Sequence, residues 1–191
     1  MKDEFLSIVL DNIERKGIDN VIKWLEDSSD FYTAPASSKF HLAEEGGLVK
    51  HSINVYKRLV REIKEQYGEE SPYTDETIAL VSLFHDICKT NFYIVKTRNV
   101  KDEKGNWNKE PYYAIDDKLP MGHGEKSLYM LQNFIRLSRD EALAIRWHMG
   151  QSDDSAKGGS YSVNNAYNIC PLAVLLNIAD LKAAYLDEIK L

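Results

Sequence analysis

One stretch of the chain, residues 79–89 (ALVSLFHDICK), constrains the fold more than any other. Apolar side chains occupy most positions around it, so a helix formed here would be apolar on all sides. A helix of that kind is buried in the core. The stretch nevertheless contains the adjacent pair His85 and Asp86, and burying such groups is costly unless they are paired or bind a metal. The rest of the chain must therefore enclose this helix and supply partners for its polar end.

The composition is typical of a globular protein. The chain has 191 residues, of which 43% are hydrophobic and 28% charged, with a net charge of -6. No apolar run reaches the length of a membrane span, and no signal-peptide pattern opens the chain. Cys88 and Cys170 are too few and too far apart for a disulfide scaffold, which favours a reducing compartment. We therefore expect a cytoplasmic protein with no membrane partner, and the negative charge disfavours long nucleic acid.

Hydrophobic periodicity predicts a chain built mainly from helices. A leading pair of helices is expected before residue 40, and the remaining helices belong to one core that extends to residue 186. The expected helical segments are residues 3–16, 20–27, 48–66, 79–89, 122–135, 138–149 and 172–189, and Pro171 is expected to start the last of them. Residues 150–162 are polar and contain glycine, which is typical of a loop. The whole chain, 1–191, is thus expected to form a single domain.

Residues 91–115 interrupt the helical pattern. Two runs rich in Tyr, Val, Ile and Trp, at residues 91–100 and 107–115, flank the turn cluster at 101–106. Such runs separated by a glycine-containing turn predict a β-hairpin. The expected fold class is therefore all-α, a helical bundle with a small β-hairpin insertion at about 91–115.

Polar groups recur on the expected buried faces of these helices. Taken singly, a histidine on an apolar face is more often a core residue than a ligand, but here the groups come from several separate elements. They are His51, His85, Asp86, His123, His148 and Asp180. Imidazole nitrogens and carboxylate oxygens suit Fe, Mn, Zn, Ni or Co better than Mg or Ca. We therefore expect a site for one or two divalent transition-metal ions.

The order and surroundings of these residues resemble a known family. The segments that carry the resemblance are GGLVKHS (46–52), LFHDICK (83–89), GHGEKS (122–127), IRWHMG (145–150) and IADL (178–181). Together they resemble the HD-domain superfamily of metal-dependent phosphohydrolases. The first segment is also similar to the HD portion of bacterial 3′–5′ exoribonucleases. The resemblance covers about residues 40–185 and implies an HD-domain helical bundle.

The resemblance also implies how the ligands divide between two ions. One ion would take His51, His85, Asp86 and Asp180, and the second would take His123 and His148, with Asp86 bridging. A water between the ions would attack the phosphate. Asp86 and Lys89 are the implied catalytic residues, and Lys89 would bind the substrate phosphate. A solvated cation favoured at a helix end is the other interpretation of Lys89.

The implied substrate is a small phosphorylated compound of the nucleotide class. Lys89, Lys96, Arg98 and Lys126 are the candidate substrate-binding residues. The aromatic residues at 91–93 and 112–113 either wall a pocket for a base or form the core of the hairpin. His41 lies near the expected entry to the site, although it is equally interpretable as a loop histidine.

Three alternatives use the same residues differently. A di-iron oxygenase can use the same ligand pattern, a single-stranded nucleic-acid exonuclease would act on a polymer, and a non-catalytic module would bind metal without turnover. The ligand pattern alone does not separate these alternatives. The sequence also leaves the oligomeric state open.

Overall fold

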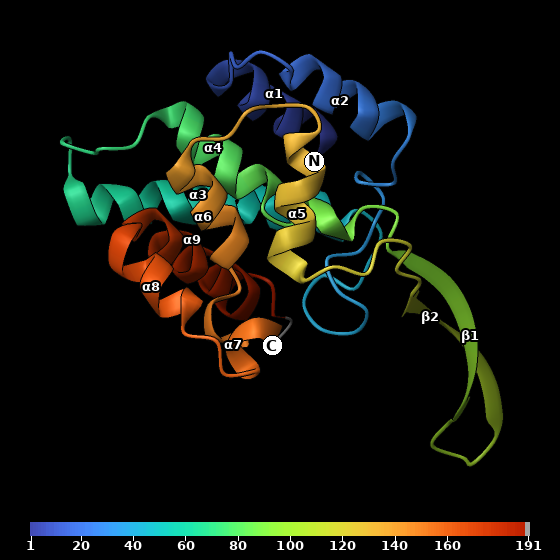
Figure 1. The fold of residues 1–191 in the computed structure, drawn as a ribbon. Helices are drawn as coiled ribbons and strands as arrows, with labels where there is room; N and C mark the ends of the chain where they lie inside the picture. Colours follow the sequence, from blue (N-terminus) through green and yellow to red (C-terminus); the bar gives the residue numbers. More distant parts are fainter. Residues whose placement is uncertain (190–191) are drawn as a thin grey trace.

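The computed structural model describes residues 1–189, which form a mainly helical fold with one projecting β-hairpin (Figure 1). The α-helices are α1 (Lys2–Asn12), α2 (Ile18–Asp27), α3 (Gly47–Tyr67), α4 (Asp75–Phe84), α5 (His123–Gln132), α6 (Arg139–Trp147), α7 (Asp154–Lys157), α8 (Ser162–Ile169) and α9 (Pro171–Lys182). The strands are β1 (Tyr93–Lys101) and β2 (Trp107–Ile115). This arrangement confirms the expected all-α class with a hairpin insertion.

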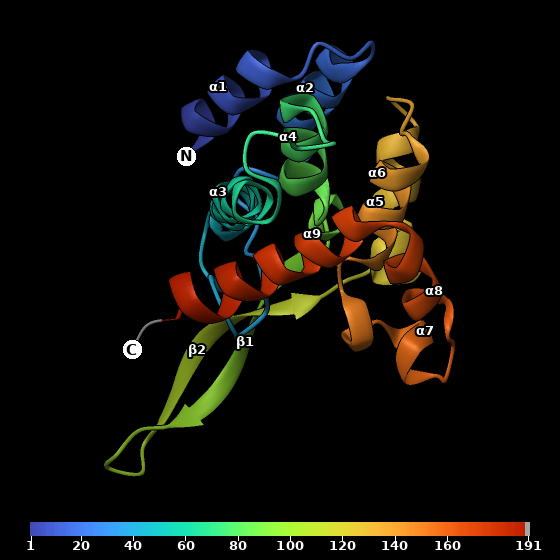
Figure 2. The same ribbon diagram turned by 90° about the vertical axis from the view of Figure 1, so that its left-hand side faces the viewer.

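Helix α4 lies at the centre and contacts α1, α3 and α6 (Figure 2). Every residue from Ile78 to Phe84 is buried, as the apolar sequence predicts. Thr74 caps its start, since the Thr74 hydroxyl accepts a hydrogen bond from the Thr77 amide. The α-helix ends at Phe84, and a 3₁₀ turn at Ile87–Lys89 follows. The pair His85 and Asp86 therefore lies in the bend between the two, at the inner end of the central helix.

The first helix is shorter than the periodicity predicts, because α1 ends at Asn12 instead of residue 16. The chain then turns at Gly17, whose φ is 101°, in the left-handed region that favours glycine. A Cβ atom there would lie 2.1 Å from the Phe134 carbonyl oxygen, so the backbones approach too closely for a side chain. The turn at Gly17 lets α2 begin at Ile18, two residues earlier than expected.

A buried carboxylate ties the N-terminal helices to the core. Ser138 and Glu141 form a capping box at the start of α6. Both guanidinium NH₂ groups of Arg15 donate to Glu141, at 2.6 and 2.9 Å. The Thr77 hydroxyl of α4 donates to the same carboxylate at 2.9 Å. Glu141 therefore joins the α1–α2 connection, α4 and α6 in one polar contact.

We expect Glu141→Ala to lower the free energy of unfolding by about 3 kcal/mol, because it removes the cap of α6 and leaves Arg15 without its bidentate partner. Urea unfolding followed by circular dichroism measures the change. Asp140→Ala is the matched control, since Asp140 is a half-buried neighbour on the same helix that pairs with Arg139 and makes no contact with Arg15. Equal stability of the two variants would contradict a linking role for Glu141.

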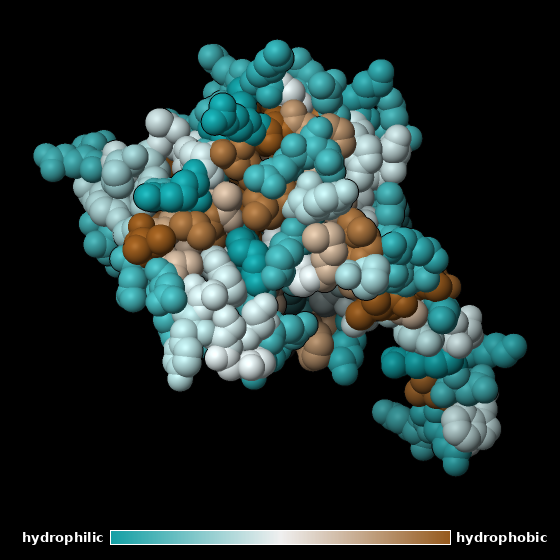
Figure 3. Space-filling model, in the orientation of Figure 1, coloured by the Kyte–Doolittle hydropathy of each residue, from teal (hydrophilic) through white to brown (hydrophobic). Residues whose placement is uncertain are grey.

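The hairpin pairs in a regular antiparallel register from Tyr93 opposite Ile115 to Lys101 opposite Trp107. It extends away from the helices (Figures 1 and 2). Most of its side chains are exposed, so the hairpin has little core of its own. The space-filling view shows a mainly hydrophilic outer half and an apolar patch near the place where the hairpin joins the helices (Figure 3).

The C-terminal part contains more helix than the sequence predicts. Residues 150–162, expected to be a loop, contain a 3₁₀ turn and the short helix α7, which Asp153 caps. Helix α8 was not expected, because it buries only Val163 and Ala166 and so has a weak apolar pattern. Helix α9 begins at Pro171 as expected but passes into a π-helical turn, Ala183–Asp187.

Within residues 1–189 no single helix is long and apolar enough to cross a membrane. Residues 162–169 and 171–187 meet that test by length and composition only when taken together, and they are bent by 109° at their junction.

Candidate metal centre

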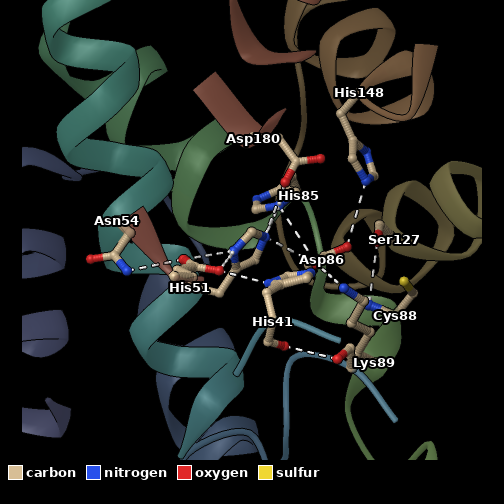
Figure 4. Close-up of polar contacts among 12 residues, drawn as sticks. His41, His51, Asn54, His85, Asp86, Cys88, Lys89, Ser127, His148 and Asp180 are labelled. Atoms are coloured by element: carbon tan, nitrogen blue, oxygen red, sulfur yellow. Dashed lines mark hydrogen bonds and ion pairs between the residues drawn. The ribbon is translucent and has the colours of Figure 1, made fainter. Parts of the chain in front are cut away.

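The six predicted ligands come together at the inner end of α4. Figure 4 labels all of them except His123. Helix α3 contributes His51, the bend after α4 contributes His85 and Asp86, and α9 contributes Asp180. The other two are His123, the first residue of α5, and His148, which caps the end of α6. Residues separated by more than a hundred positions thus meet because three helix ends and two helix faces converge there.

The two carboxylate oxygens of Asp86 face different partners. The Oδ2 atom lies 3.5 Å from His51 Nε2 and 3.6 Å from His85 Nε2. His51 Nε2 also lies 3.1 Å from Asp180 Oδ1. The Oδ1 atom lies 2.6 Å from His123 Nε2 and 3.5 Å from His148 Nε2. Asp86 thus stands between two groups of side chains that match the division implied for two ions.

Hydrogen bonds to main-chain carbonyls fix the orientation of two imidazoles. His85 Nδ1 donates to the Ser82 carbonyl at 2.8 Å, and His148 Nδ1 donates to the Ile145 carbonyl at 2.7 Å. These bonds leave each Nε2 as an acceptor directed at Asp86. Metal-binding histidines in proteins are oriented in this way.

The donor set fits a cation. His148 Nε2 is buried and makes no hydrogen bond within residues 1–189, yet it lies 3.5 Å from a carboxylate oxygen. A buried polar atom without a partner is costly, and two facing acceptors repel each other unless a positive charge lies between them. A divalent ion with nitrogen and oxygen ligands removes both costs, which makes the six residues a candidate metal centre.

A comparison with protein families gives an independent result. The family model described as HD domain matches residues 48–185, which is most of the chain. The chain belongs to the HD-domain family. No curated protein and no solved structure matches it. The family implies metal-dependent phosphohydrolase chemistry, whereas the likeness to exoribonucleases has no support from these comparisons.

The pKa values of the side chains in the HD centre indicate which ligands are protonated when no metal is bound. Burial lowers the pKa of His51, but hydrogen bonds to Asp180 and Glu188 outweigh it and raise that pKa to about 9. Burial likewise opposes protonation of His123, whose pKa rises to about 10 beside Cys88 and Asp86. The pKa of His85 falls to about 3, chiefly through burial. Burial favours protonation of Asp86, yet the charge of Lys89 holds its pKa well below the usual value.

These pKa values predict that metal binding releases protons. His51 and His123 are protonated at neutral pH in the metal-free protein, and each must lose a proton to become a ligand. The apparent metal affinity should therefore increase with pH and level off above about pH 9 to 10. Titration calorimetry of Mn²⁺ in buffers of different ionisation enthalpy measures the proton release. An affinity that does not change between pH 6.5 and 9 would contradict the assignment of both histidines.

Glu188 is a site residue that the sequence analysis missed. Its side chain is buried, its carboxylate lies 3.1 Å from His51 Nδ1, and Asn54 donates to it at 2.9 Å. It also accepts a hydrogen bond from His41 Nδ1 at 2.6 Å. Glu188 therefore orients His51 from behind, so that His51 Nε2 points into the centre.

Cys88 is the second residue that was missed. Its sulfur lies 3.4 Å from His123 Nδ1 and 3.7 Å from His123 Nε2, close to both nitrogens of the imidazole that contacts Asp86. The sequence analysis considered Cys88 only as one of two cysteines too far apart for a disulfide scaffold, and that pattern does not place it beside His123.

A cavity of about 640 Å³ opens onto the centre and gives access to Asp86, His123 and Asp180. Lys89 lines it, with its Nζ atom 2.5 Å from Asp86 Oδ2. His41 lines it too, which favours a place at the site over the loop-histidine interpretation.

The other predicted substrate contacts lie outside the lining of this cavity. Lys96 and Arg98 are exposed on the hairpin, where Arg98 lies over the Tyr112 ring. Lys126 is buried and pairs with Asp117 at 2.5 Å, so its charge is already compensated. Their assignment as substrate-binding residues stays a prediction, to which the lining of the cavity adds nothing. The aromatic residues of the hairpin do not line the cavity either.

Proposed function

We propose that this HD domain hydrolyses a phosphate ester of a small nucleotide-type compound with the help of one or two divalent transition-metal ions. One observation carries the proposal. Asp86 presents both oxygens to buried imidazoles, including the unpartnered His148 Nε2, at the floor of an open cavity. A purely structural role explains neither the unpartnered nitrogen nor the access from solvent.

The ligand groups follow from the two sides of Asp86. His51, His85 and Asp180 would hold an ion together with Oδ2, and His123 and His148 would hold a second ion together with Oδ1. When bound, such ions polarise a phosphoryl group and make water a stronger nucleophile at neutral pH. The second group has fewer anionic ligands, so we propose that its affinity is lower.

The chain supplies the remaining parts of the proposed reaction. The Lys89 ammonium is held at the cavity floor by Asp86, where it is placed to neutralise charge on a substrate phosphate. Asp86 raises the pKa of Lys89 above its usual value against the opposing effect of burial, so this charge persists at neutral pH. Lysine ammonium is no metal ligand, which leaves it available to the substrate.

The size of the cavity favours a small substrate. About 640 Å³ lies within the range of sites that bind whole small molecules, roughly 300–1,000 Å³. The chain also has a net charge of -6, which repels an extended polyanion. We therefore propose nucleotides over long nucleic acid as substrates.

Metal analysis and a substrate panel test this proposal. The purified protein is loaded with Mn²⁺, Fe²⁺, Co²⁺ or Ni²⁺, and mononucleotides, dinucleotides and a long single-stranded oligonucleotide are supplied at equal phosphate concentration. Chromatographic separation of the products measures the rate at which phosphate ester bonds are broken in each. We expect metal-dependent hydrolysis of the small substrates. Degradation of the oligonucleotide alone would overturn the preference for small substrates. Oxygen consumption by the iron-loaded protein without any hydrolysis would overturn the phosphohydrolase proposal in favour of an oxygenase.

A further inference from the structure

The cavity has a second wall that the metal centre does not use. Apolar residues of two segments form it, Phe40 and Leu42 from the segment before α3, and Leu181, Tyr185 and Ile189 from the end of the chain's last helix. Phe40 is 74% exposed and Tyr185 66% exposed. Large apolar side chains left exposed together at the mouth of a charged cavity indicate contact with an apolar part of a ligand.

Backbone hydrogen bonds hold the first of these segments in an unusual conformation. Leu42 has a φ of 46°, in the left-handed region that bulky residues other than glycine rarely adopt. Its carbonyl accepts from the Ala36 amide at 3.1 Å, and the Phe40 amide donates to the Ser37 hydroxyl at 2.8 Å. Strain of this kind is found at ligand sites, where the surrounding structure compensates for it. The fixed segment presents Phe40 at the cavity.

The second segment is equally irregular. Tyr185 lies in the π-helical turn Ala183–Asp187 that ends the last helix. Turns of this type are rare in proteins, and many of those that occur lie at functional sites. Ala184 of the same turn and Glu188, the residue after it, also line the cavity. Two irregular backbone segments therefore place one aromatic side chain each at a single cavity.

The charges of the lining indicate what these aromatic residues contact. Among the described residues that line the cavity, Lys89 is the only lysine, and there is no arginine. Glu44 adds a carboxylate to the lining. Lys39, whose ammonium lies 5.0 Å from the centroid of the Phe40 ring, is not part of the lining. A second phosphate in this part of the cavity would find little positive charge. A neutral planar group would find two aromatic side chains.

We propose that Phe40 and Tyr185 form an aromatic subsite that stacks on the base of a nucleoside monophosphate whose phosphate lies near Lys89 and Asp86. The inference rests on the proposed function, because the phosphate end of the substrate is assigned by it. The subsite selects a substrate with one phosphate and one base. It disfavours both a polyphosphate chain and a phosphosugar without a base.

Paired substrates test the subsite. Adenosine 5′-monophosphate and ribose 5-phosphate share the phosphate and the sugar, and only the first has a base. We expect the wild-type protein loaded with Mn²⁺ to have the higher kcat/KM on adenosine 5′-monophosphate. Phe40→Ala and Tyr185→Ala should each reduce that value by about 5–150-fold, which is the measured range for loss of a base-stacking side chain. The reduction on ribose 5-phosphate should be much smaller.

Two further variants exclude a general loss of structure. Phe40→Trp and Tyr185→Phe keep an aromatic ring and should retain the preference for the base. Tyr161→Ala is the matched control, since Tyr161 is 77% exposed and lies outside the lining of the cavity. Equal losses on both substrates in the alanine variants, or no preference in the wild type, would overturn the proposal.

A binding measurement separates failure of the subsite from failure of the proposed function. Calorimetry on the Mn²⁺-loaded protein compares the affinity for the same two compounds without reference to turnover. Tighter binding of adenosine 5′-monophosphate that is lost in Phe40→Ala, without hydrolysis of either compound, supports the subsite and refutes the phosphohydrolase. Hydrolysis of both compounds at equal rates and with equal affinity refutes the subsite and supports the phosphohydrolase.

Discussion

Asp86→Asn is expected to reduce metal affinity by more than about 100-fold and to remove phosphoester hydrolysis. Loss of a residue that only orients a metal ligand already costs roughly 10–100-fold. Asp86 has a larger role, because its two oxygens face His51 and His85 on one side and His123 and His148 on the other. The asparagine keeps the shape of the side chain but removes the negative charge and one acceptor oxygen.

Metal content of the purified variant and calorimetric titration with Mn²⁺ measure this effect. Asp117→Asn is the matched control, because Asp117 also pairs with a lysine, at 2.5 Å, but lies outside the lining of the cavity. Glu188→Gln should give an intermediate loss, since Glu188 contacts His51 from behind and does not face Asp86. Wild-type metal content in Asp86→Asn would show that the six residues form a structural cluster and not a metal centre.

Much of this centre could be predicted from the sequence, because its ligands lie on strongly patterned helices. His51 follows the apolar stripe of α3, and His85 and Asp86 follow the most apolar stretch of the chain. Burial of such groups demands partners, which makes the pattern informative. The predicted convergence agrees with the structure, whereas ligation itself remains a prediction.

Glu188 could not be predicted, because its position depends on the π-helical turn. In a continuous α-helix, eight residues rotate about 80° beyond two full turns, so Glu188 would lie on a different face from Asp180. The π turn has more residues per turn and takes back much of this rotation. No residue type at 183–187 marks such a turn. The oriented pair of His51 and Glu188 thus depends on a backbone irregularity without a sequence signal.

Three of the predicted substrate contacts lie outside the lining of the cavity, so their role in substrate binding stays a prediction. Lys96, Arg98 and Lys126 were chosen by their charge. The hairpin, however, extends away from the helices, and Lys126 is neutralised by Asp117 (Figure 1). The cavity is instead lined from the segment before α3, where Leu42 has an unfavourable φ. Long-range packing of a loop is not encoded in local periodicity.

Lys89→Met is expected to reduce turnover by about 100-fold or more while metal binding is retained. Removing one group that stabilises transition-state charge costs about 10²–10³-fold in other enzymes. Methionine keeps the length and the apolar contacts of the lysine side chain but removes its charge. Lys89 pairs with Asp86 Oδ2, so in the metal-free protein it competes with an ion for that oxygen. The variant should therefore bind metal at least as tightly as the wild type.

Turnover at saturating Mn²⁺, together with calorimetric titration, separates the two roles of Lys89. Lys118→Met is the control, because Lys118 pairs with Asp116 on the surface, where 75% of its side chain is exposed. Loss of metal binding in Lys89→Met would mean that Lys89 maintains the centre and does not act on the substrate. Unchanged turnover would mean that Lys89 is only a cation favoured at the end of the 3₁₀ turn, with no role in the reaction. Low turnover at full metal occupancy is the result that assigns its charge to the phosphate.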